Sequence, residues 1–132
     1  MTAPLSDARI AALALIVPDY AAGLAFYVQR LGFRLIEDVD QGRKRWITVA
    51  PPGGGPVLVL ARADTEEQRA AIGRQGAGRV WLFLETGDFA RDHAALLAAG
   101  AIFEEAPRHE PYGTVAVWRD PFGNRWDLLQ RH

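Results

Sequence analysis

The feature that most constrains this chain is an internal repeat, in which the same landmarks recur about 69 residues apart. In the first copy, an apolar run at residues 10–17 predicts a strand. Asp19 stands where a helix-capping side chain is needed, and Gly32 can end the helix that we expect over residues 20–31.

The second copy repeats this order. Residues 79–86 predict the strand, Asp88 the cap, residues 89–99 the helix and Gly100 its end. Each copy continues with three strand-like segments, and a turn with proline and glycine joins the last two, at 51–54 and again at 120–124. The sequence therefore predicts an α+β domain built from two βαβββ modules.

The segment between the copies reads as a linker. Residues 63–78 are polar, have helical character in their first half and end in Gly73, Gly76 and Gly78. We therefore expect a single domain, with module one at about 8–62, the linker at about 63–78 and module two at about 79–131. With 132 residues, 49% of them apolar, the chain can bury a real core.

Composition excludes several classes of function. Fifteen basic and sixteen acidic residues give a net charge of −1 with no basic stripe, so we expect no nucleic-acid partner. No apolar run approaches the roughly 20 residues of a membrane span, and the N-terminus lacks a secretory pattern, so we expect a cytoplasmic protein without a membrane partner. With no cysteine and three histidines, chemistry has to come from carboxylates, Arg, Tyr or the few His.

Two separated motifs carry a resemblance to a known family. One is Val17-Pro-Asp19 with Phe26-Tyr27 and Leu31-Gly-Phe33; the other is the segment 120–128, Asp-Pro-Phe-Gly-Asn-Arg-Trp-Asp-Leu. The chain resembles the vicinal oxygen chelate superfamily of glyoxalases, bleomycin resistance proteins and extradiol dioxygenases over about residues 10–130. The resemblance implies a cupped, half-open mixed sheet around a small-molecule cavity, helices on the outside and a homodimer.

The resemblance also implies where a metal would bind. Metal-dependent members take one ligand from the first strand and one from the last strand of each module, and counting onto this chain gives Ala12, Leu58, Trp81 and Asp127. Of these side chains, only Asp127 offers a lone pair to a divalent ion. We therefore expect no metal cofactor, and keep a divalent metal as the less favoured alternative.

Side chains alternate across a strand, so residues that share parity with these four positions are expected to face the same cavity. The expected lining is an apolar bowl with a few polar groups, which suits an organic ligand. Its members are Ala12, Ala14, Ile16, Leu58, Leu60, Trp81, Phe83, Glu85, Arg125, Asp127 and Leu129.

Two of these residues are carboxylates and are the candidate catalytic groups. Apolar neighbours would raise the pKa of Glu85 and Asp127 and suit a general base. In the alternative, Arg125 or Arg119 pairs with them, or water solvates them, and they are structural.

Six residues are candidate ligand contacts. Trp81 can stack on an aromatic ligand or hold a cation, but the same ring can equally fill the core. Tyr112 and His109 lie between two expected strands, where they can form a lip over the cavity. The remaining three, Leu58, Phe83 and Arg125, are expected to line the bowl itself.

Two functions remain open. The favoured hypothesis is a protein that holds a small, partly aromatic or cationic molecule without the family metal, as the resemblance to bleomycin resistance proteins implies. The alternative is a lyase, isomerase or dioxygenase of the same superfamily that uses a divalent metal or a carboxylate base.

Overall fold

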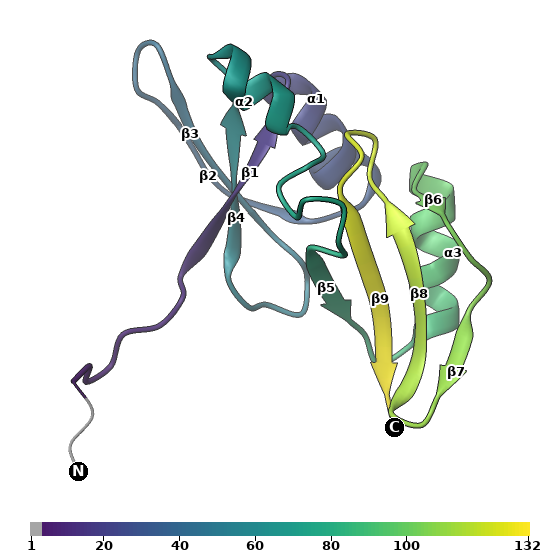
Figure 1. The fold of residues 1–132 in the computed structure, drawn as a ribbon. Helices are drawn as coiled ribbons and strands as arrows, with labels where there is room; N and C mark the ends of the chain where they lie inside the picture. Colours follow the sequence, from purple (N-terminus) through teal and green to yellow (C-terminus); the bar gives the residue numbers. More distant parts are fainter. Residues whose placement is uncertain (1–3) are drawn as a thin grey trace.

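The chain folds into two mixed sheets, one from each module, in a computed structural model that describes residues 4–132 (Figure 1). In the first sheet the strand order is β1-β4-β3-β2, with β1 parallel to β4 and the other pairs antiparallel. Its strands are β1 (Ala12–Val17), β2 (Arg34–Asp40), β3 (Arg45–Ala50) and β4 (Val57–Arg62).

The second sheet repeats this plan with the order β5-β9-β8-β6, and β5 is parallel to β9. Its middle segment is divided into two short strands that both pair with β8. The strands are β5 (Leu82–Glu85), β6 (Ile102–Phe103), β7 (Arg108–Glu110), β8 (Gly113–Arg119) and β9 (Arg125–Arg131). The predicted α+β class with two βαβββ modules is confirmed.

The helices begin and end where their capping residues predict. Asp19 accepts a hydrogen bond from the Ala22 amide at 2.7 Å, and Asp88 accepts one from the Arg91 amide at 3.2 Å. The first helix changes from α to π hydrogen bonding halfway along, so that it runs as α1 (Tyr20–Leu24) and a π-helical segment (Ala25–Arg30). The other helices are α2 (Glu66–Ala71) in the linker and α3 (Phe89–Ala99).

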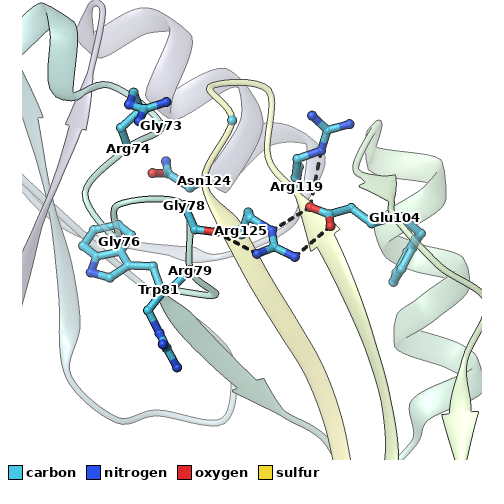
Figure 2. A pocket seen from close by; sticks show the side chains of 12 residues that line it. Gly73, Arg74, Gly76, Gly78, Arg79, Trp81, Glu104, Arg119, Asn124 and Arg125 are labelled. Carbon is cyan, nitrogen blue, oxygen red and sulfur yellow. Dashed lines mark hydrogen bonds and ion pairs between the residues drawn. The ribbon is translucent and has the colours of Figure 1, made fainter.

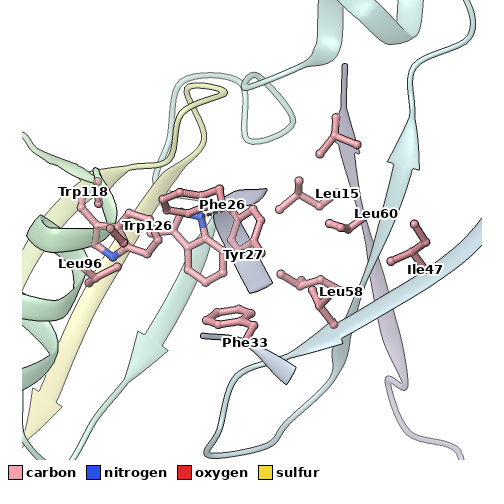
Figure 3. Close-up of a cluster of buried hydrophobic side chains, with 14 of the residues drawn as sticks. Leu15, Phe26, Tyr27, Phe33, Ile47, Leu58, Leu60, Leu96, Trp118 and Trp126 are labelled. Atoms are coloured by element: carbon pink, nitrogen blue, oxygen red, sulfur yellow. Dashed lines mark hydrogen bonds between the residues drawn. The ribbon is translucent and has the colours of Figure 1, made fainter. Parts of the chain in front are cut away.

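One hydrophobic core joins the two modules. Phe26 and Tyr27 of the π-helical segment lie between Leu15 of the first sheet and the tryptophans of the second (Figure 3). Trp118 and Trp126 are stacked, with ring centroids 5.0 Å apart and planes 15° apart. One face of each sheet therefore packs into a shared core, in which both tryptophans are buried.

A buried polar network crosses this core. The Tyr27 hydroxyl of module one donates to Asp120 of module two, which also accepts from the backbone amides of Phe122 and Asn124 and from the Asn124 side chain. The Trp126 indole donates to the Tyr27 oxygen at 3.2 Å. Burial, and then the charge of Asp120, raises the pKa of Tyr27 well above its usual value.

The strand register corrects one part of the expected lining. Leu58 pairs with Leu13 and Leu60 with Leu15, so both leucines point into the core, and Leu58 is only 4% exposed. On β4 the residue that corresponds to Asp127 is Val59, because Val59 pairs with Ala14 as Asp127 pairs with Phe83. The placement of Leu58 and Leu60 on the cavity face was wrong.

A turn length explains this error. Six residues separate β3 from β4, whereas five separate β8 from β9. The repeat displacement therefore falls from 69 to 68 at the last strand of each module, as the pairs Ala14–Val59 and Phe83–Asp127 show. One extra residue is enough to turn every side chain of a strand to the other face.

The Tyr27–Asp120 bond predicts an alkaline limit to stability. The pKa of Tyr27 is raised in the folded state, so the unfolded chain loses this proton at a lower pH than the folded chain does. The contribution of Tyr27 to the free energy of unfolding is therefore complete below about pH 10 and is lost as the pH rises above that value. Tyr27→Phe should lower the free energy of unfolding at pH 7 by about 1–3 kcal/mol and flatten the alkaline decline. Urea titrations at pH 7 to 11 measure both effects. The exposed Tyr112→Phe is the control, and a Tyr27→Phe variant as pH-sensitive as that control would contradict the assignment.

The corrected register predicts unequal costs for two neighbouring truncations. Leu58→Ala should destabilise the protein by about 3 kcal/mol because it opens a cavity in the core. Val59→Ala on the other face should cost about 1 kcal/mol or less, since this side chain is partly exposed. Denaturant unfolding of the two variants measures the difference. Equal or reversed costs would contradict the corrected register and would place Leu58 on the open face.

Candidate ligand-binding site

The candidate site lies on the face of the second sheet that is turned away from the core, which we call the second open face. Register places six of the expected lining residues here, as alternation predicted. Val115 and Val117 of β8 join them from across the sheet. The six are Phe83, Glu85, Arg125, Asp127 and Leu129, with Trp81 just ahead of β5, where it also packs against the core.

Asp127 is the polar group at the centre of this face. Its Oδ1 is buried, and no donor among residues 4–132 reaches it. Burial raises the pKa of Asp127, partly offset by the positive charge of Arg108. Phe83 stands beside it on β5 and is 64% exposed, so a carboxylate without a partner lies next to an exposed aromatic ring.

Glu85 does not have the apolar surroundings that the sequence led us to expect. Its side chain is half exposed and pairs with Arg131 at 3.4 Å. It also lies two residues beyond Phe83, the residue that pairs with Asp127, so the two carboxylates are not opposite each other. The geometry favours a solvated carboxylate at this position.

Trp81 and Arg125 meet at one end of the second open face, where the linker forms a hollow of about 670 Å³ that we call the linker hollow (Figure 2). Arg125 makes two 2.8 Å hydrogen bonds to Glu104 and a third to the Gly78 carbonyl. The bond from Arg125 lowers the pKa of Glu104. Arg125 is therefore held by Glu104, a partner that the sequence did not reveal, and makes no ion pair with Asp127.

A second hollow, of about 870 Å³, runs along the free edge of β5 toward the 51–56 turn and α3. Phe83 and Glu85 border it on one side of the strand, and Leu82 and Leu84 on the other. Leu58 lies at this hollow too, from the core side rather than from the open face.

The expected lip over the cavity is instead a strand pair. Residues 108–110 form β7 on β8, with Arg108 opposite Val115 on the second open face and His109 opposite Thr114 on the other side of the sheet. His109 Nδ1 contacts the Thr114 hydroxyl at 3.2 Å. His109 therefore points away from the candidate site, and its placement as a lip residue was wrong. Tyr112 lies exposed in the turn that follows and borders neither hollow.

The first sheet carries polar residues that the sequence did not single out. Glu37, Trp46 and Thr48 lie on its face opposite the core, in register with Val59. Glu37 Oε1 accepts from the Trp46 indole at 3.1 Å and from the Thr48 hydroxyl at 3.2 Å. The alternation of side chains along a strand predicted the position of Asp127. The same rule applied to β2 and β3 would have predicted Glu37 on the open face of the first sheet.

The fold agrees with comparisons to known proteins. The model of the Glyoxalase/Bleomycin resistance protein/Dioxygenase superfamily matches residues 9–128. The chain belongs to this superfamily. An uncharacterized protein of Shewanella frigidimarina is 50% identical over 121 residues, which cover 89% of this chain and 90% of the relative.

Solved structures have the same fold. UcmS2 superposes with a TM-score of 0.80 at 31% identity, covering 94% of this chain and 98% of its own. TnmS3, described as an antibiotic binding protein from Streptomyces sp. CB03234, gives 0.75 at 27% identity, covering 97% of this chain and 99% of its own.

The superfamily's metal positions do not fit a divalent ion in this chain. With the corrected register they fall on Ala12, Val59, Trp81 and Asp127, and only the aspartate can donate a lone pair. Within residues 4–132, no three His, Asp or Glu side chains gather into a set that could hold a metal. No helix in this part of the chain is long and apolar enough to span a membrane.

The unpartnered carboxylate of Asp127 predicts a variant that gains stability. Since burial raises its folded-state pKa above the unfolded value, ionised Asp127 lowers stability above that folded pKa, and the penalty disappears as the pH falls below about 4. Asp127→Asn should therefore raise the free energy of unfolding at pH 7, by less than about 1 kcal/mol because water screens the group. Urea unfolding at pH 7 and pH 4 measures this gain, with Glu85→Gln as control. A loss of stability at pH 7 would mean that the carboxylate holds the fold together.

Proposed function

We propose that this protein binds a small, partly aromatic organic cation on the second open face, and that it holds this ligand without a metal ion. The observation that carries the proposal is Asp127 Oδ1, a buried carboxylate oxygen that no described donor satisfies. A ligand that donates a hydrogen bond to this oxygen regains on binding what burial without a partner costs the carboxylate.

The neighbours of Asp127 suit the rest of such a ligand. Phe83 offers an exposed ring on one side, and Trp81 lies two residues before it, just ahead of β5 and partly buried against the core. Aromatic faces attract cations and stack on planar groups. An ammonium or amidinium group at Asp127, attached to a ring that rests on Phe83, would use both features.

The residues at the superfamily metal positions favour ligand binding over catalysis. Three of the four superfamily metal positions carry side chains without a lone pair. TnmS3, which has this fold at 27% identity, is described as an antibiotic binding protein. The one feature that favours an enzyme is the raised pKa of Asp127, which suits a general base, and a lyase or isomerase remains the second candidate.

We propose that a second copy of the chain closes the site. In the single chain, Ala14 on the first sheet and Phe83 on the second are both exposed, so part of each open face is uncovered. Homodimers with twofold symmetry are the commonest oligomers, and they join such faces reciprocally. Sedimentation analysis at micromolar concentration should give a dimer, and a monomer would remove this part of the proposal.

Isothermal titration calorimetry with 2-naphthylmethylammonium tests the function, with uncharged 2-naphthylmethanol as the matched ligand. The cation should bind the wild-type protein more tightly than the alcohol does. Asp127→Asn should weaken the cation about tenfold, the effect of one charge-assisted hydrogen bond, and leave the alcohol unchanged. Trp81→Ala and Phe83→Ala should weaken both ligands.

Glu85→Gln is the matched control, because it removes a carboxylate from the same face that already pairs with Arg131. Equal binding of the two ligands, or equal effects of Asp127→Asn and Glu85→Gln, would rule the proposal out. A stoichiometric metal in the purified protein would instead put the enzyme first.

A further inference from the structure

The linker hollow has a character opposite to that of the second open face. It is bordered by the linker, by the first residues of module two and by the turn between β8 and β9 (Figure 2). Four of its side chains are arginines and one is a glutamate, which gives a net charge of +3. The charged residues are Arg74, Arg79, Arg119, Arg125 and Glu104.

Two of these arginines form no ion pair with a described carboxylate. Arg119 and Arg125 share Glu104, at 3.6 Å and 2.8 Å. No carboxylate among residues 4–132 forms an ion pair with Arg74 or Arg79, which stand near either end of the linker segment at the hollow (Figure 2). Guanidinium groups bind carboxylate and phosphate oxygens with paired hydrogen bonds, so this rim favours an anion.

Asn124 adds a buried acceptor. The residue is 2% exposed, and its side chain turns toward the linker (Figure 2). Its Nδ2 donates to Asp120 at 2.8 Å, and because a carboxylate only accepts, this bond decides which end of the amide is the oxygen. That oxygen, Oδ1, has no donor among the described residues. A buried amide oxygen at the hollow therefore lacks a hydroxyl or amine donor.

The wall of the hollow is aromatic and tightly built. A Cβ atom added at Gly76 would come within 2.9 Å of the Trp81 Cβ and of the Arg79 carbonyl, so the linker lies directly on Trp81. At Gly73, where φ is +73°, a Cβ would lie 2.0 Å from the Phe122 carbonyl. These close approaches hold the linker against the turn and keep the Trp81 ring at the side of the hollow.

We propose that the linker hollow is a second binding site, which takes a planar aromatic anion that also carries a hydroxyl or amine group. The anion, a carboxylate or a phosphate, is attracted by Arg74 and Arg79 from opposite ends of the hollow (Figure 2), the ring lies on Trp81, and the hydroxyl or amine donates to Asn124 Oδ1. This site does not depend on the cation site at Asp127, although the two share Trp81.

Calorimetry with the full chain and 6-hydroxy-2-naphthoate tests the proposal. The compound should bind, and 2-naphthoate, which lacks the hydroxyl donor, should bind about three- to tenfold more weakly. Arg74→Gln/Arg79→Gln should weaken the hydroxynaphthoate by a similar factor, because two exposed cations are removed. Binding of 6-hydroxy-2-naphthyl phosphate with the same dependence on these arginines supports the site and assigns a phosphate to its ligand.

Arg43→Gln/Lys44→Gln is the control, since it removes the same charge from a hairpin of the first sheet. Asp127→Asn should not weaken the anion, which separates this test from that of the cation site. The proposal fails if neither hydroxylated anion binds at millimolar concentration, or if the two double variants weaken binding equally. Equal affinity for 2-naphthoate and its hydroxy derivative would remove Asn124 from the site and overturn the proposed ligand class.

Discussion

Tyr27 and Asp120 hold the two modules to one another. The tyrosine comes from the helix of module one, the aspartate from the last turn of module two, and both are buried where the covered faces of the sheets meet. A buried carboxylate is stable only when donors surround it, and here the tyrosine hydroxyl completes a set of backbone and side-chain N–H groups. The stacked tryptophans and Phe26 pack around this network and exclude water from it. The core of each module is therefore completed by the other.

This arrangement decides where function can lie. Because the modules are joined through their covered faces, both open faces remain free for a ligand or a second copy. On β9, Trp126 belongs to the core and the next residue, Asp127, belongs to the open face. A single strand thus contributes to both stability and recognition, and the carboxylate is kept without a partner at some expense of stability.

Charge divides the second module into two regions. Around Asp127 the face is apolar and carries an acidic group without a partner, whereas the linker hollow is framed by arginines. Glu104 holds Arg125 through two hydrogen bonds, so this arginine acts on Asp127 through its charge and not through an ion pair. The charges of Arg108 and Arg125 lower the pKa of Asp127, but burial raises it more.

The sequence by itself determined the repeat, the capped helices and the face that carries Asp127, because caps and strand alternation are local properties of a few neighbouring residues. Only the tertiary structure decided that Leu58 lies in the core, that Arg131 pairs with Glu85, that His109 points away and that Asn124 Oδ1 meets a hollow. These outcomes depend on the register between strands far apart in the chain. One residue in the turn before β4 reverses that register for a whole strand, and no local pattern records it.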